Sequence, residues 1–141
     1  RELLVVVQGP HGYISPRWYG DVPAVPTWNF VSAHLSGIPE LLEPAENLRV
    51  LERLVDRFEG TGPQARGLYT LPNDEAFVER LERGTIGFRL TPTRVTAKRK
   101  LSQNKSAEVV ETVIAGLAAE GPARDDLVAE MRRAADARPR A

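Results

Sequence analysis

Hydrophobic residues along the first third of the chain follow the patterns of two β-strands. Residues 3–8 (LLVVVQ) are continuous, β-branched and followed by Gly9-Pro10, which predicts a strand buried on both faces. Residues 28–36 instead alternate in character, and a period of two predicts a second strand. One face would carry Trp28, Phe30, Ser32 and His34, and the other Asn29, Val31, Ala33 and Leu35.

The pattern then changes to a helical spacing. A first helix is expected to begin at Pro44, where the missing N–H has no cost, and to end at Gly60. Its apolar stripe consists of Leu48, Leu51, Leu54, Val55 and Phe58. After a glycine-rich loop over residues 60–71, a short helix over 74–83 is predicted, with Asn73 as its cap.

The second half of the chain has the same order of predicted elements as the first, two strands followed by two helices. Residues 85–90 and 95–101 read as strands on either side of Pro92, and Ser106 begins a helix that ends at Gly121-Pro122. The residues of this helix predicted to face inward are Val109, Val110, Val113, Ile114 and Leu117. A weaker helix with Leu127, Val128 and Met131 follows and leads into a disordered end. The order β, β, α, α, β, β, α, α favours an α+β fold with an antiparallel sheet or small barrel over a parallel sheet.

Composition narrows the function classes. The 141 residues carry equal numbers of acidic and basic side chains, so net charge gives no argument for a nucleic-acid or polybasic membrane partner. The absence of cysteine excludes disulfides, thiolate metal sites and cysteine nucleophiles, and fits a cytoplasmic protein. No apolar run could span a bilayer and no signal peptide is visible. Because Arg1 leads almost at once into an apolar run, we expect the sequence to be part of a longer chain.

Aromatic and polar side chains of the types that bind ligands are concentrated in residues 9–37. This stretch holds both tryptophans, both histidines, two of three tyrosines and four of eleven prolines. It suits a ligand surface, or else an aromatic-rich hairpin that only packs. Two histidines without clustered carboxylates make a poor metal site, so no metal is predicted. The residues also form no Ser-His-Asp set or carboxylate pair, and no catalytic residue is assigned.

A second polar segment lies at residues 89–105, which contain six basic residues and no acid. All three lysines of the chain, Lys98, Lys100 and Lys105, fall within it. Ser102, Gln103 and Asn104 add a hydroxyl and two amides, a set that suits the imide edge of a flavin or the edge of a base. The alternatives are a polyanion site, an edge strand protected by lysines, or a polar turn that caps a helix.

Three segments together carry a family resemblance. GPHGYISPRWY (9–19), VPTWNFVSAHLSG (25–37) and KLSQNKSAE (100–108), in this order and spacing, closely resemble the PaiB family of FMN-binding split-barrel proteins, described as negative transcriptional regulators. The resemblance covers residues 3–117. It implies an antiparallel split β-barrel like that of pyridoxamine-phosphate oxidases, and a homodimer with FMN in a groove between subunits. In such proteins the part before this segment supplies further strands and much of the phosphate site.

The resemblance also implies a domain arrangement. Residues 1–122 would be the C-terminal portion of an FMN-binding split-barrel domain, partial here, with a helical insertion at 44–83. Residues 123–141 would be a helical tail, which matches nothing in the resemblance.

Candidate roles in FMN binding follow for individual residues. Trp18, Tyr19 or Trp28 would cover the flavin ring, although Trp28 suits a core position equally well. Asn29, Gln103 and Asn104 would pair with the pyrimidine edge, and Lys100 or Arg17 would stabilise negative charge on the ring or phosphate. The expected hydroxyl donors are Ser15, Thr27 and Ser102.

Gene repression is the function that the resemblance implies. An FMN-dependent oxidoreductase and a non-catalytic flavin sensor are the alternatives, because a fold and a cofactor do not fix a reaction. The sequence supports the flavin part better than DNA binding. The helix predicted from Ser106 is mostly apolar and acidic, whereas recognition helices present basic and polar residues.

Overall fold

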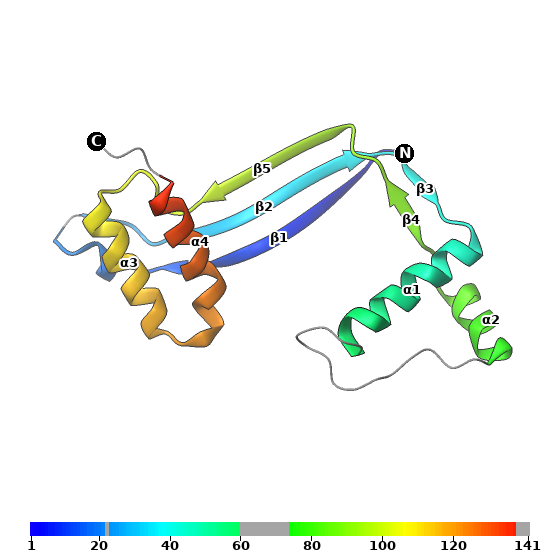
Figure 1. Ribbon diagram of the computed structural model, residues 1–141. Coiled ribbons are helices and arrows are strands. Elements are labelled where there is room, and N and C mark those ends of the chain that lie inside the picture. Colours follow the sequence, from blue (N-terminus) through cyan, green and yellow to red (C-terminus); the bar gives the residue numbers. More distant parts are fainter. Residues whose placement is uncertain (22, 60–73, 138–141) are drawn as a thin grey trace. The chain divides into compact units, whose positions relative to one another are not determined.

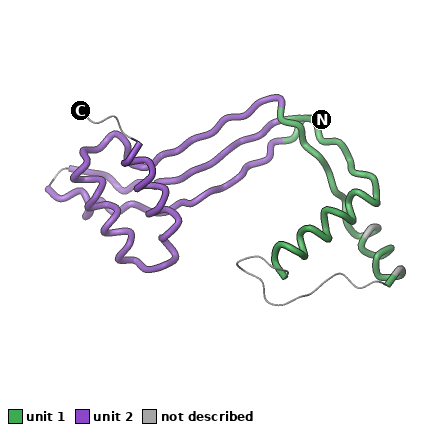
Figure 2. The backbone as a smooth tube through the Cα atoms, in the orientation of Figure 1, with its two compact units in different colours: residues 1–3, 37–92 green, residues 4–36, 93–141 purple. Residues whose placement is uncertain are grey.

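A computed structural model describes residues 1–21, 23–59 and 74–137 (Figure 1). The chain divides into two compact units (Figure 2). The larger unit consists of Leu4–Ser36 and Thr93–Ala141, and the smaller unit of Arg1–Leu3 and Gly37–Pro92. The predicted loop at residues 60–71 and the predicted cap Asn73 lie outside the described residues, as do residues 138–141. A disordered end is predicted for residues 135–141, but Ala135 and Asp136 belong to a helix.

An antiparallel three-stranded sheet forms the framework of the larger unit. It contains β1 (Leu3–Ile14), β2 (Thr27–Gly37) and β5 (Arg94–Lys100) in the order β1-β2-β5. Strands β2 and β5 pair with Phe30 opposite Lys100 and Ser36 opposite Arg94. Both strands predicted in the first third of the chain are therefore confirmed, as is the extended segment after Pro92.

The expected burial of the first strand on both faces is wrong. Leu4, Val6 and Val7 of β1 are each more than half exposed. Strand β1 is an edge strand, and its buried side chain, Ile14, lies at its far end. An apolar run predicts a strand, but it does not determine which other elements cover that strand.

Helices α3 (Ala107–Ala119) and α4 (Asp125–Asp136) pack side by side at one end of this sheet (Figure 1). Ser106 caps α3, with its Oγ accepting from the N–H of Val109 at 3.3 Å, as the sequence predicted. Two short 3-10 helices, η1 (Pro16–Tyr19) and η2 (Pro122–Arg124), precede β2 and α4 respectively. The core consists of Ile14, Tyr19, Leu101, Val110, Val113, Ile114, Leu117, Leu127, Val128 and Met131. Helix α4 thus supplies buried residues as α3 does, more than its weak sequence pattern suggested.

The smaller unit pairs β3 (Pro39–Leu41) with β4 (Phe88–Leu90) and contains helices α1 (Pro44–Glu59) and α2 (Glu75–Gly84). The predicted start of α1 at Pro44 is confirmed. Asp74 caps α2, because its side chain accepts from the N–H of Phe77 at 3.2 Å. The strand predicted over residues 85–90 is shorter, since only β4 pairs within it.

These observations confirm an α+β fold with antiparallel sheets. The strands in the described part of the chain do not close into a barrel. Helices α3 and α4 do not cover Trp28 of β2, and its side chain is about half exposed on one face of the sheet.

Candidate functional site

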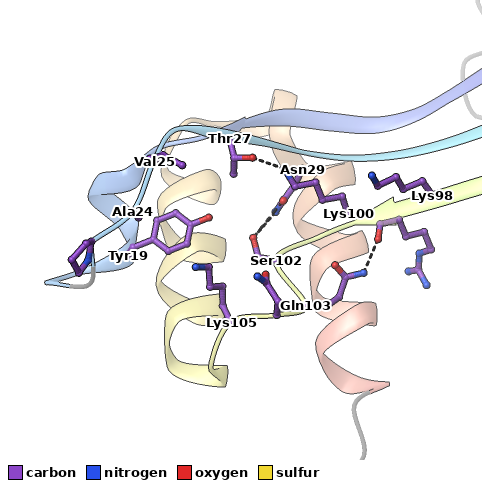
Figure 3. A pocket seen from close by; sticks show the side chains of 13 residues that line it. Tyr19, Ala24, Val25, Thr27, Asn29, Lys98, Lys100, Ser102, Gln103 and Lys105 are labelled. Atoms are coloured by element: carbon purple, nitrogen blue, oxygen red, sulfur yellow. Dashed lines mark hydrogen bonds between the residues drawn. The ribbon is translucent and has the colours of Figure 1, made fainter.

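A groove of about 780 Å³ lies where β2 begins and β5 ends, within the larger unit (Figure 3). Three parts of the chain line it: Tyr19 with residues 23–25, then Thr27 and Asn29, and then Lys98–Lys100 with the turn that follows β5. The residues of this turn that face the groove are Ser102, Gln103, Asn104 and Lys105. Segments more than seventy residues apart in sequence therefore form one surface.

The turn after β5 is closed by the side chain of Gln103. Its Oε1 accepts from the backbone N–H of Leu101 at 2.7 Å, and its Nε2 donates to the carbonyl oxygen of Arg99 at 2.8 Å. Ser102 has a φ of +62°, in the left-handed region that non-glycine residues rarely adopt. Both polar ends of the Gln103 amide are thus engaged by the main chain, and this side chain shapes the turn.

A buried polar pair joins β2 to this turn. Asn29 is fully buried and Ser102 nearly so. The Nδ2 of Asn29 donates to Ser102 Oγ at 3.0 Å, and the same hydroxyl lies 3.3 Å from Asn29 Oδ1. Asn29 Nδ2 also lies 3.4 Å from the sulfur of Met131 on α4. Because a buried amide is costly without hydrogen bonds, this pair fixes the turn against β2.

Basic side chains surround the groove, and none of the described residues that line it is acidic. Lys100 donates from Nζ to Thr27 Oγ1. The Nζ of Lys105 lies 5.2 Å from the centre of the Tyr19 ring. Lys98 lines both this groove and a second hollow that contains Phe30, and its Nζ lies 5.8 Å from the centre of the Phe30 ring. The groove is therefore suited to an anionic ligand.

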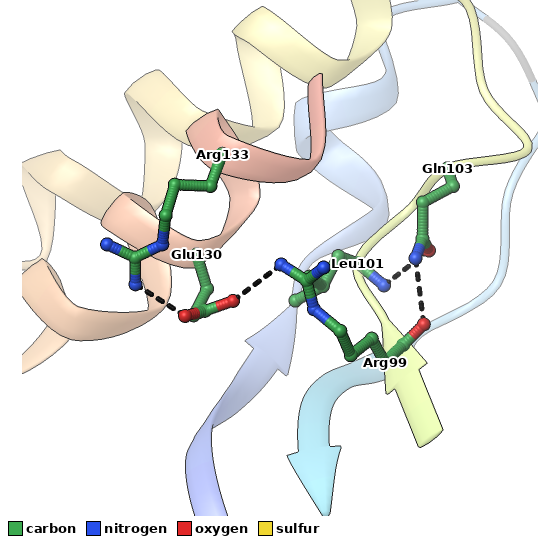
Figure 4. A network of polar contacts seen from close by, with 5 residues as sticks. All are labelled: Arg99, Leu101, Gln103, Glu130 and Arg133. Atoms are coloured by element: carbon green, nitrogen blue, oxygen red, sulfur yellow. Dashed lines mark hydrogen bonds and ion pairs between the residues drawn. The ribbon is translucent and has the colours of Figure 1, made fainter. Parts of the chain in front are cut away.

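Arg99, which also lines the groove, forms an ion pair with a carboxylate. Its Nη2 lies 2.7 Å from Oε2 of Glu130 on α4, and Arg133 binds the other carboxylate oxygen (Figure 4). Hydrogen bonds from Arg133 and then Arg99 lower the pKa of Glu130 below its ordinary value. Glu130 is therefore a charged anchor for Arg99 throughout the neutral pH range.

Three residues predicted for the flavin site lie beside α3 instead of in the groove. Ser15 caps η1, with its Oγ accepting from the N–H of Arg17 at 3.3 Å. The indole of Trp18 packs on Gly116 of α3, where a Cβ atom would lie 2.5 Å from the ring. Ser15, Arg17 and Trp18 line a separate hollow of about 650 Å³.

Trp28 lies on the face of the sheet opposite Asn29, as the alternation in the sequence predicted. It is 51% exposed, and its ring centre lies 5.9 Å from that of His11 and 6.4 Å from that of Tyr13. It shares a hollow of about 550 Å³ with Phe30, Ser32 and His34. Trp28 is thus an exposed aromatic on this face, not a core residue and not part of the groove.

The structure therefore brings seven of the eleven predicted site residues into one groove. These are Tyr19, Thr27, Asn29, Lys100, Ser102, Gln103 and Asn104. The lining also includes Lys98, Arg99 and Lys105, which the sequence marked only as part of a basic block. Residues 23–25 carried no chemical signal, because small apolar side chains next to prolines are typical of any turn.

The fold and the groove define a class: a small α+β protein with a cationic ligand site at the end of an antiparallel sheet. The family described as "Putative FMN-binding domain" matches residues 1–94 of the chain. The chain belongs to this family, which confirms the resemblance found in its three sequence motifs.

Several curated proteins are similar to the chain. It is 32% identical over 105 residues to "Protease synthase and sporulation protein PAI 2" of Bacillus subtilis, which covers 74% of the chain and 49% of that protein. An uncharacterized protein of Emericella nidulans is 29% identical over 129 residues, covering 82% of the chain and 51% of the relative. One from Saccharomyces cerevisiae is 30% identical over 74 residues, covering 48% and 44%. The chain spans about half the length of the curated relatives it matches.

Two features are absent from the part of the chain that the structure describes. None of its helices combines the length and the apolarity needed to cross a membrane. Its acidic and histidine side chains form no cluster of three that could hold a metal ion.

Proposed function

We propose that the groove binds FMN and that the protein is a flavin-binding regulator of the PaiB type. One observation carries the proposal: in a chain of an FMN-binding family, the groove joins three lysines to a buried amide–hydroxyl pair. The lysines are Lys98, Lys100 and Lys105, and the pair is Asn29 with Ser102.

The residues of the groove fit the chemistry of FMN. The phosphate of FMN is an anion, and lysines with no acidic neighbour in the lining suit it. Tyr19, Ala24 and Val25 provide an apolar side for the ring, and Asn104 is exposed at the rim for its polar edge. When bound, FMN would supply redox chemistry at its ring.

The chain's own side chains would bind and orient this ligand. The side chain of Lys100 is held by its hydrogen bond to Thr27 at the start of β2, so we assign it to the phosphate or to negative charge on the ring. Asn29 and Ser102 hydrogen-bond to each other, so their role is to hold the wall of the groove in place. Gln103 has the same role through the main chain of the turn.

The finer features of the family belong to the proposal as well. The sheet β1-β2-β5 would be part of a split barrel, and two copies of the chain would form a homodimer with FMN between them. The partly uncovered apolar face of β1 supports this, because exposed strand faces and edges are ordinarily covered in a stable assembly.

Regulation is proposed ahead of catalysis because the family resemblance points to it. The flavin would then act as a signal, because its binding or its redox state would change the regulatory activity of the protein. Oxidation of NAD(P)H by the FMN-loaded protein would instead identify an oxidoreductase.

The proposal is tested by titrating FMN into the protein and following flavin fluorescence. The parent protein should bind, and Lys100→Ala should weaken binding by about tenfold, since a charge-assisted contact contributes about 1.5–3 kcal/mol. Arg94→Ala is the matched control: it removes a cation from the same strand, opposite Ser36 and outside the groove. If the parent shows no uptake, or if both variants bind as the parent does, the groove is not the flavin site.

A further inference from the structure

Helix α4 contacts the wall of the groove although it lies beyond the residues that the family model matches. The match covers residues 1–94, whereas α4 is Asp125–Asp136. Two neighbouring residues of α4, Glu130 and Met131, make these contacts.

The first contact runs from Glu130 through Arg99 to the turn. The Arg99 guanidinium lies 2.7 Å from the Glu130 carboxylate, and the Arg99 carbonyl oxygen accepts from Gln103 at 2.8 Å (Figure 4). The other end of the Gln103 amide accepts from the N–H of Leu101. Arg99 therefore connects α4, through its side chain, to the turn that carries Ser102, through its carbonyl oxygen.

The second contact runs from Met131 through the buried pair. The Met131 sulfur lies 3.4 Å from Asn29 Nδ2, which in turn donates to Ser102 Oγ. Met131 is fully buried, so its position is set by the core between α3, α4 and the sheet. Two adjacent residues of α4 therefore contact the same wall of the groove: Glu130 binds Arg99 on β5, and Met131 lies against Asn29 on β2.

We infer that Glu130 is a positioning residue for the groove, holding Arg99 from α4 so that the wall at residues 99–103 keeps its shape. Arg133 lies one turn along α4 and binds the second oxygen of the same carboxylate, which orients it toward Arg99. This inference rests on the proposed binding of FMN.

The test compares FMN affinity and the visible circular dichroism of the bound flavin in the parent, Glu130→Gln, Arg99→Gln and the double variant. Each single change should weaken binding by about three- to tenfold and alter the dichroism of the flavin. The double variant should lose no more than the weaker-binding single variant, because both changes remove one contact. Arg99→Gln breaks that contact from an exposed strand residue, so a failure of Glu130→Gln to fold would not end the test.

Glu120→Gln is the matched control, since it removes a carboxylate from an ion pair with Arg124 away from the groove. It should leave both the affinity and the dichroism of the parent unchanged. Unchanged or tighter binding by Glu130→Gln and Arg99→Gln would overturn the inference, as would additive losses in the double variant. If the parent itself fails to bind FMN, the proposed function falls first, so the two failures are distinguishable.

Discussion

The contact between Trp18 and Gly116 shows how one small residue places a large one. The indole lies so close to α3 that a Cβ at residue 116 would come within 2.5 Å of three of its atoms. The hydroxyl of Thr112 donates to the carbonyl oxygen of Trp18 at 2.7 Å and holds the same stretch of chain. Trp18 thus joins η1 to α3, a structural role outside the groove.

Replacing Gly116 with alanine should destabilise the protein by about 1–3 kcal/mol. Alanine is a better helix former than glycine by about 1 kcal/mol, but here its methyl group would overpack the indole. Urea unfolding followed by tryptophan fluorescence measures the change. Gly84→Ala, at a position with open space around it, is the control and should be neutral or stabilising. A Gly116→Ala protein as stable as its parent would contradict this packing.

The sequence identified polar groove residues better than aromatic ones. Lys100, Ser102 and Asn104 follow one another closely, so a single turn presents them together whatever the rest of the fold does. Trp18 and Trp28 could not be assigned in this way. The position of Trp18 depends on a glycine 98 residues further along the chain. The exposure of Trp28 depends on which face of the sheet the helices cover.

At the scale of elements, α4 is the segment whose importance the sequence underestimates. Its apolar positions predicted a helix, but a short stripe does not show how much of the core it forms. Leu127, Val128 and Met131 are buried because α3 and the sheet both pack against them. The opposite error arose at β1, whose apolar run predicted more burial than this edge strand has. In both cases the missing information was the partner element.

The docking of α4 should weaken in acid because of Glu130. Its pKa is lowered in the folded protein by Arg133 and Arg99, so its contribution to stability is fully present above the unfolded value and disappears as pH falls through the folded value. Urea unfolding of the parent and Glu130→Gln at several pH values measures this. The parent should be the more stable at pH 6, and the difference should shrink toward pH 3. A difference that stays constant over this range would show that the carboxylate is not the source.

At the scale of the molecule, a neutral chain contains a cationic groove. The equal numbers of acidic and basic residues give no sign of this local positive charge, because no acidic residue lines the groove. Glu130, the carboxylate that pairs with Arg99 of the lining, also binds Arg133. The order of strands and helices was enough to predict an antiparallel α+β fold. Barrel closure and pairing of two copies stay predictions, since they depend on surfaces beyond a single copy of this chain.

The most direct test of the account is an amide NMR map of FMN binding, which is practical for a chain of 15.6 kDa. Signals of the full chain would be followed during titration with FMN. The groove predicts the largest shifts at Thr27, Asn29 and residues 100–105, with little change at Ser32, His34 and Thr96 on the opposite face of the sheet. No shifts, or the largest shifts at Ser32, His34 and Thr96, would contradict the assignment of this groove to the flavin.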